Sequence, residues 1–269
     1  METLKVASAQ LHLVDNDFEG NMAKVHGMVE RVMTESSVDL LLFPEVCVEG
    51  IDTSTYKAQR LTDEKIAEID SFWREMAFIS GIHILAGRTG KKDGAWQNLA
   101  TCYAPDKTVL AEYSKIHLYN TERDFYTPGD TRVIFNLKGF RIGIMICADL
   151  GFPELSRAMA ADGVDLFAVC SCWGEPQSML WCLCNQMRAA ENGCYLVSSN
   201  RVGAEITGRK AIGNSMLVGP SGEVLANLGL TDNGYFTHTI QKGSYSSMLP
   251  PCSYWLEWRR PELYTPAGE

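Results

Sequence analysis

The chain lacks an excess of basic residues. Its 269 residues include 24 lysines and arginines against 33 aspartates and glutamates, for a formal net charge of −9. No cluster of lysine and arginine offsets this acidity. Since nucleic acids and anionic membrane surfaces are bound largely through positive charge, we expect neither as a partner.

The sequence also lacks the long apolar segments that membranes and secretion require. No uninterrupted apolar run approaches the roughly 20 residues that span a bilayer. The opening METLKVASAQ has neither the positive n-region nor the apolar h-region of a signal peptide. We therefore expect a cytoplasmic protein.

Cysteine motifs for metal binding are missing, although the chain has 9 cysteines. In a cytosolic chain we expect these as reduced thiols. One residue separates each close pair, Cys170/Cys172 and Cys182/Cys184, whereas structural zinc sites usually have about two to four intervening residues. The second pair lies in a predicted helix, where residues two apart point to roughly opposite sides. We predict no metal site.

No linker rich in proline, glycine or serine divides the chain, so we predict a single domain over residues 1–269. Short apolar, β-branched runs predict strands over residues 4–13, 39–46, 82–90, 141–147, 164–171 and 194–202. Between them, apolar residues recur every three or four positions, which predicts helices that pack on a sheet. The three stripes are Phe18, Met22, Val25, Val29 and Val32; Ile66, Ile69, Trp73, Met76 and Ile79; and Leu180, Leu183, Met187 and Ala190, before Gly193 as a helix-ending residue.

Two further segments have the alternation of β-hairpins, namely residues 97–115 and residues 211–228. Alternating strands and helices with added hairpins predict an α/β fold in layers, with sheets inside and helices outside. The C-terminal residues, about 245–269, include Trp255, Trp258 and Tyr264. We expect this aromatic tail to pack on the domain or on a partner subunit.

Two residues at the ends of predicted strands are candidates for chemistry. Cys147 ends RIGIMIC and precedes a predicted helix, whose unpaired N–H groups would favour a thiolate. The alternative is an inert core cysteine. Glu45, in LLLFPEVCVEG, is either a charge at the rim of the sheet or a general base in a cleft, where desolvation would raise its pKa.

A third candidate segment is YSKIHLYNTERDFYTPGD. Lys115 lies in an extended run, where alternation puts His117 on the same face. Near a thiol, Lys115 would stabilise an oxyanion, and otherwise it is a solvated surface lysine. Glu122 follows seven residues after Lys115.

Together these segments resemble the signature of the nitrilase superfamily of carbon–nitrogen hydrolases. LLLFPE corresponds to the family's catalytic glutamate at Glu45, YSKIHLYNTE to its lysine at Lys115 and supporting glutamate at Glu122, and GIMICADLGFPE to its nucleophile at Cys147. NQMRAAENGCYLVSSNRVG and GNSMLVGPSGEVLA are similar to further family blocks. The resemblance extends from residue 7 to about residue 239.

The resemblance implies amide hydrolysis without a metal or an organic cofactor. Glu45 would accept the proton of the Cys147 thiol and deliver it to the leaving nitrogen. Lys115 and the backbone N–H of Ala148 would bind the oxyanion. Glu45 would then activate the water that releases the acid from the Cys147 thioester, while Glu122 orients Lys115 or the substrate amine.

The same resemblance implies an architecture and an assembly. Members of this family form a four-layer α-β-β-α sandwich, and they associate as homodimers or higher homo-oligomers through their outer helices. The helix after Cys147 and the helix that ends near Gly193 are the corresponding interface candidates.

The residues after the nucleophile indicate the substrate class. Ala148-Asp149 resembles the amidase and carbamoylase branches more than true nitrilases, which carry Trp-Glu. ERDFYTPGD and SCWGEP are also similar to amidases, with Trp173 as a wall of the pocket. We therefore expect a small linear amide or N-carbamoyl amine as the substrate.

Three alternatives to this function are a nitrilase acting on a small nitrile, a thiol hydrolase with a Cys147–His117 dyad, and a non-catalytic ligand-binding protein. Arg123, Arg188 and Arg201 are candidates to bind a substrate carboxylate, but the sequence does not distinguish them from structural arginines.

Overall fold

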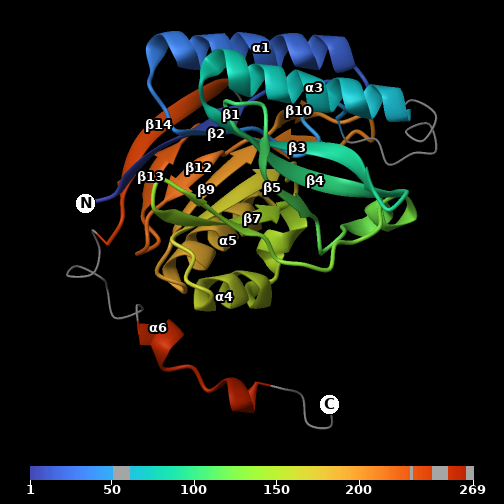
Figure 1. Cartoon of the computed structure of the whole chain (residues 1–269). Coiled ribbons are helices and arrows are strands. Elements are labelled where there is room, and N and C mark those ends of the chain that lie inside the picture. Colours follow the sequence, from blue (N-terminus) through green and yellow to red (C-terminus); the bar gives the residue numbers. More distant parts are fainter. Residues whose placement is uncertain (51–60, 231–232, 244–253, 265–269) are drawn as a thin grey trace.

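The computed structural model describes residues 1–50, 61–230, 233–243 and 254–264. Two six-stranded sheets form the centre of the molecule (Figure 1). In spatial order, the first contains β14 (Gly234–Gln241), β1 (Thr3–Gln10), β2 (Leu40–Leu42), β3 (His83–Lys92), β4 (Ala95–Tyr103) and β5 (Val109–Ser114). The second contains β13 (Val224–Asn227), β12 (Met216–Val218), β9 (Tyr195–Asn200), β8 (Leu166–Ser171), β7 (Phe140–Ile146) and β6 (Ile134–Leu137). A small sheet pairs β10 (Val202–Ala204) with β11 (Lys210–Ile212).

Helices cover the outer faces of both sheets. α1 (Phe18–Glu35) and α3 (Asp63–Ser80) lie over the first sheet, at the top of Figure 1, and α4 (Pro153–Ala161) and α5 (Ser178–Ala190) cover the second. Thr62 accepts a hydrogen bond from the backbone N–H of Lys65 at the start of α3, and Gly81 ends that helix at φ +67°. The predicted α-β-β-α sandwich is confirmed.

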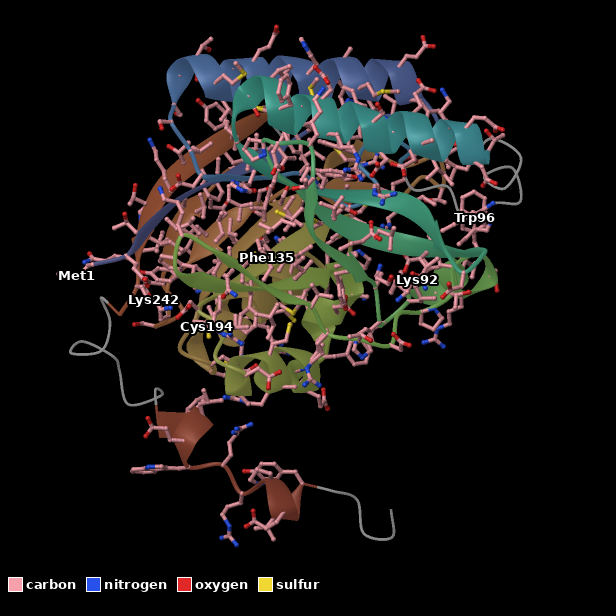
Figure 2. The ribbon with its side chains drawn as sticks, viewed as in Figure 1. Met1, Lys92, Trp96, Phe135, Cys194 and Lys242 are labelled. Carbon is pink, nitrogen blue, oxygen red and sulfur yellow. The ribbon has the colours of Figure 1, made fainter. Side chains whose placement is uncertain are left out.

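Alternation along the strands explains how three apolar layers form. In β2, Leu40 and Leu42 point between the sheets, whereas Leu41 points to α1 and α3. In β8, Phe167 packs towards α4 and α5, while its neighbours point between the sheets. Phe135, labelled in Figure 2, belongs to the layer between the sheets. Strands with both faces buried therefore contain nearly continuous apolar runs, such as residues 40–42 of β2 and 166–170 of β8.

The central strands are parallel to their neighbours, which puts their carboxyl ends at one edge. β1, β2 and β3 run parallel in the first sheet, and β7, β8 and β9 run parallel in the second. The two predicted hairpins are confirmed as the antiparallel pairs β4–β5 and β12–β13. The strand predicted over residues 39–46 is shorter, because it ends at Leu42, two residues before Pro44.

The prediction for α5 is wrong about which face packs on the sheet. Leu180, Leu183 and Met187 are 50%, 54% and 44% exposed. The face that packs on the sheet instead contains Trp181, Asn185, Arg188 and Ala189. Its polar members are buried because they bond to the backbone: Asn185 Nδ2 donates to Trp181 O at 2.7 Å and Arg188 Nε to Leu150 O at 3.0 Å. The helix thus has a second apolar stripe, which faces solvent.

Part of the predicted C-terminal tail, residues 245–253 and 265–269, lies outside the described residues. In the described part, α6 (Tyr254–Glu257) lies against α4, and Leu256 packs on the core beneath it. Trp258 and Tyr264 are 72% and 65% exposed. Among the described residues, no helix combines the length and apolarity needed to cross a bilayer.

Candidate active site

Glu45 follows β2 at the edge where the parallel strands end. Its backbone N–H donates to Ser171 O of the second sheet at 3.3 Å, so this residue lies between the sheets. The segment packs directly on Gly87 of β3, where a Cβ would lie 2.4 Å from the Cα of Glu45. Gly87 is therefore required for the close backbone approach that positions Glu45.

Cys147 occupies a strained turn at the end of β7. Its φ is +44°, a left-handed conformation that costs a non-glycine residue energy. The turn continues as a 3₁₀ segment (Cys147–Gly151), and α4 begins only at Pro153. The α-helix predicted to start beside the cysteine is thus displaced by one short turn.

Lys115 and Glu122 come from the loop after β5. The backbone N–H of Lys115 donates to Asn98 O at 2.9 Å, which continues the β4–β5 pairing by one residue. Glu122 lies on the 3₁₀ helix η1 (Asn120–Asp124), and its Oε2 accepts the backbone N–H of Tyr119 at 2.8 Å. Both side chains turn inward from these positions.

The structure brings all four predicted catalytic residues together. Lys115 Nζ lies 2.7 Å from Glu45 Oε1 and 2.9 and 2.8 Å from the two carboxylate oxygens of Glu122. Cys147 lines the same cavity as these three residues, close enough to Glu45 for each group to shift the other's pKa. The side chains of Glu45 and Lys115 are fully buried, and that of Glu122 is 8% exposed. A thiol, a carboxylate and an ammonium group thus form one buried cluster.

The charges of this cluster determine the protonation of each member. Burial opposes ionisation of Glu45, but the Lys115 ammonium and the hydrogen bonds from Lys115 and Asn98 hold its pKa below its usual value. Burial by itself would lower the pKa of Lys115, but Glu45 and Glu122 raise it well above its ordinary range. Burial, with repulsion from Glu45, raises the pKa of Glu122.

Two expectations about ionisation are corrected by this geometry. The pKa of Glu45 is lowered rather than raised, because the adjacent ammonium outweighs desolvation. The pKa of the Cys147 thiol is raised to about 12 by burial and by the Glu45 charge. The resting nucleophile is therefore a neutral thiol with a carboxylate beside it, not a thiolate stabilised by a helix terminus.

Asn98 of β4 is part of the cluster, although its residue type did not single it out in the sequence. Its Nδ2 donates to Glu45 Oε1 at 2.7 Å and to Glu122 Oε1 at 3.3 Å, and the residue is 1% exposed. The available signal was a polar residue at a buried position of the 97–115 hairpin. Its Oδ1 has no hydrogen-bond partner within the described chain.

Asp149 connects the nucleophile turn to the lysine loop. Its Oδ2 accepts from the backbone N–H of Ile146 at 3.0 Å and from the Tyr113 hydroxyl at 2.7 Å. Its Oδ1 accepts the backbone N–H of His117 at 3.0 Å and lies 2.8 Å from His117 Nδ1. The carboxylate therefore holds the Cys147 turn against the loop that carries Lys115.

This contact removes the support for a Cys147–His117 dyad. β5 ends at Ser114, so the alternation predicted to put Lys115 and His117 on one face does not continue. The imidazole instead faces Asp149 and stacks on Phe152, with ring centroids 3.7 Å apart. His117 lines a separate cavity with Arg123 and Tyr126.

The cluster forms the floor of a cavity of about 510 Å³. Ala148 and Trp173, the two predicted substrate-binding residues, both line it, as do Phe152 and Leu180. Trp173 is 9% exposed, and its Nε1 donates to Gln177 O at 3.1 Å. The walls are thus largely apolar, and the volume accommodates a small organic molecule.

The three arginines considered as carboxylate ligands have other contacts. Arg201 is buried and pairs with Asp15 at 2.6 Å, and Arg188 pairs with Glu191 at 2.7 Å. Arg123 lines the His117 cavity. The arginine that lines the cavity of Cys147 is Arg209, together with Glu205, and sequence analysis singled out neither.

Within the described ranges, no group of three or more His, Cys, Asp or Glu side chains has the arrangement of a metal site.

Comparison with known proteins identifies the family of this chain. The family model of carbon-nitrogen hydrolases matches residues 5–248. A probable nitrilase of Schizosaccharomyces pombe is 30% identical over 258 residues, which cover 92% of each chain.

Solved structures give the same result at the level of fold. The crystal structure of an amidase from Nesterenkonia sp. has a TM-score of 0.87 and 27% identity, covering 97% of this chain and 95% of that one. Mutants of that amidase, each with a TM-score of 0.86, have been solved with acrylamide added to the active-site cysteine and in complex with butyramide. Since the family model spans most of the sequence and the fold agrees, this chain belongs to the carbon-nitrogen hydrolase family.

Proposed function

We propose that this protein hydrolyses the C–N bond of a small linear amide or N-carbamoyl amine through a thioester on Cys147. One observation carries the proposal: a neutral thiol shares the floor of a small cavity with a buried carboxylate and an ammonium group, and the last two lie 2.7 Å apart. The amidase of known structure, which has been solved in complex with butyramide, supports an amide rather than a nitrile as substrate.

In the first half of the reaction, the Cys147 sulfur attacks the amide carbon while Glu45 accepts the thiol proton. The raised thiol pKa means that this proton leaves as the C–S bond forms, not beforehand. Lys115 and the backbone N–H of Ala148 donate to the oxyanion of the tetrahedral intermediate. The intermediate collapses when Glu45 protonates the leaving nitrogen, and the thioester remains.

In the second half, Glu45 removes a proton from water, which attacks the thioester carbon. The C–S bond breaks, the carboxylic acid leaves, and the proton returns to the Cys147 sulfur. Glu122 holds Lys115 in place throughout by accepting from its ammonium, and Asn98 holds Glu45 by donating to its carboxylate. The cycle requires only water as a second reactant.

A turnover assay by mass spectrometry tests this function. The purified protein is incubated with simple amides, monoamides of diacids, N-carbamoyl amines, acylated amines and nitriles, with the Cys147→Ala variant as the blank. We expect hydrolysis of an amide or N-carbamoyl compound by the wild type and none by the variant. Absence of both turnover and a covalent adduct on Cys147 for every compound would instead support a non-catalytic ligand-binding protein.

We further propose that the exposed stripe of α5 pairs with a second copy of the chain. Met179, Leu180, Leu183 and Met187 are between 44% and 74% exposed on one helix, and Leu180 also lines the Cys147 cavity. Such a contiguous apolar face is typical of an interface. It lies on the helix that family resemblance gives as an interface candidate.

The substitution Leu183→Glu tests this assembly. A carboxylate on the stripe would have to be desolvated in the dimer, so we expect it to convert the protein to monomers. The control is Met33→Glu on α1, which is 41% exposed and lies on the opposite side of the sandwich. Light scattering coupled to size-exclusion chromatography measures the mass of each variant. A wild-type monomer, or a Leu183→Glu dimer, would contradict the proposal.

A further inference from the structure

The wall of the catalytic cavity contains a charged pair that the proposed chemistry does not use. Glu205 and Arg209 lie in the turn between β10 and β11, closed by hydrogen bonds from Glu205 N to Arg209 O and from Gly208 N to Glu205 O, each 2.8 Å. Gly208 has a φ of +84°, which permits this turn. Both charged side chains and Thr207 line the cavity.

Glu205 is fully occupied by its neighbours and is 5% exposed. Its Oε1 accepts from Arg209 Nη2 at 2.6 Å and from the Cys172 thiol at 3.2 Å. Its Oε2 accepts from Arg209 Nε at 2.9 Å and from the Thr207 hydroxyl at 3.2 Å. Both oxygens of this carboxylate already accept hydrogen bonds from protein donors. Glu205 therefore holds Arg209 in place rather than binding a ligand.

Arg209 is held by one edge of its guanidinium and leaves the other edge unused. Nε and Nη2 bond to Glu205, and Nη2 also donates to Cys172 O at 2.9 Å. Nη1 makes no hydrogen bond within the described part of the chain, although the side chain is only 27% exposed. A guanidinium presents five donors in a rigid fork, so the two N–H groups of Nη1 have a defined direction.

The position of this arginine relates it directly to the reacting atoms. Cys172 links Arg209 to Glu45. Its carbonyl accepts a hydrogen bond from Arg209, and its backbone N–H donates to Glu45 Oε2 at 3.0 Å. The Cys147 thiol and Arg209 line the same cavity. A substrate whose amide carbon lies at Cys147 would therefore share this cavity with Arg209.

We propose that Arg209 is a specificity-determining residue, which binds a hydrogen-bond acceptor oxygen at the far end of the substrate's acyl chain through Nη1. The preferred substrates would be short amides with a second carboxylate or carbonyl group, and simple aliphatic amides would bind less well. This inference rests on the proposed amide hydrolysis for its substrate class. The Glu205 carboxylate pre-orients the guanidinium, so little side-chain entropy is lost on binding.

Three ligands of similar size distinguish the effect of a negative charge on binding from the effect of a neutral acceptor oxygen. Succinamic acid ends in a carboxylate, succinamide in a neutral carbonyl, and butyramide in a methyl group. The monoamides of malonic and glutaric acid extend the series to a shorter and a longer chain between the amide and the carboxylate. We measure kcat/KM for each with the wild type, and Kd for each with Cys147→Ala, which binds without turnover.

The test compares these values with those of Arg209→Met. Loss of a charge-assisted hydrogen bond predicts a fall of about tenfold or more in the preference for the best acceptor-bearing amide over butyramide. We expect the same change in the ratio of Kd values when Arg209→Met is combined with Cys147→Ala. The matched control is Arg132→Met, an arginine that is 47% exposed and paired with Asp162 on the surface, and its ratios should equal those of the wild type.

A second variant guards against misfolding, because Arg209→Met leaves the Glu205 carboxylate buried and unpaired. Glu205→Gln combined with Arg209→Met removes both charges, and it should lose the same preference. An unchanged preference in either folded variant, or a wild type that prefers butyramide over all acceptor-bearing amides, would overturn the inference. A shifted Kd ratio without turnover of any amide would support the role of Arg209 in binding and contradict the proposed hydrolysis.

Discussion

Replacing Glu45 by glutamine is expected to lower kcat by about 10³-fold or more for any amide that the protein hydrolyses. Glutamine has the same shape but cannot accept the thiol proton, and the pKa of that thiol is about 12. In the same assay, His117→Ala should lower kcat less than about tenfold, since it removes only a hydrogen bond to Asp149 and a stacking contact.

The comparison of these two variants distinguishes the two thiol mechanisms. Glu75→Gln is the control, a carboxylate that is 48% exposed and paired with Lys107, and it should retain full activity. Thermal unfolding confirms that each variant is folded. If His117→Ala were inactive while Glu45→Gln kept its activity, a Cys147–His117 dyad would replace the mechanism proposed above.

Replacing Lys115 by methionine is expected to destabilise the protein by about 3–5 kcal/mol near neutral pH. The substitution leaves the carboxylates of Glu45 and Glu122 buried without their shared cation. For a chain of this size, that loss corresponds to a fall in Tm of about 10 °C, at about 2–4 °C per kcal/mol. Activity should be lost as well, because the oxyanion loses its charged donor.

The pH dependence of this effect identifies its electrostatic origin. Without Lys115, burial raises the pKa of both carboxyl groups in the folded state above their unfolded values. A group with a raised folded pKa contributes stability below its unfolded pKa, and this contribution is lost as the pH rises through the folded value. The difference in Tm between wild type and Lys115→Met should therefore grow from about pH 4 to pH 7.

Differential scanning calorimetry across this range provides the measurement. Lys138→Met is the matched control, because Lys138 is 53% exposed and pairs with Asp39 on the surface. The free energy of unfolding of Lys138→Met should stay within about 0.5 kcal/mol of the wild-type value at every pH. If the difference in Tm between the wild type and Lys115→Met did not change with pH, lost packing rather than unpaired charge would be what destabilises the variant.

Local patterns in the sequence predicted most of the secondary structure. Apolar, β-branched runs gave β1, β3, β7, β8 and β9 within a few residues, and turn residues gave both hairpins. These elements depend on residues that are neighbours in the chain, so their periodicity can be read directly. The four layers and the catalytic residues came instead from the family resemblance.

The candidate site was predicted only as far as its motifs extend. Glu45, Lys115, Glu122 and Cys147 each lie in a recognisable segment, and the structure places them in contact. Asn98, Glu205 and Arg209 lie in segments without such a motif. They reach the cavity because β4 and the β10–β11 turn are brought there by pairings between distant parts of the chain.

The sequence by itself determined most of the strands, the main helices and both hairpin turns, because these follow from local periodicity, and its family motifs identified the four clustered residues. Only the tertiary structure decided which face of α5 is buried, since the sheet contacts the mixed face with Trp181 and Arg188 and leaves the more apolar face exposed. Only the tertiary structure decided the ionisation of Glu45 as well. Its pKa is the balance between desolvation and the Lys115 ammonium, 70 residues away in sequence and 2.7 Å away in space.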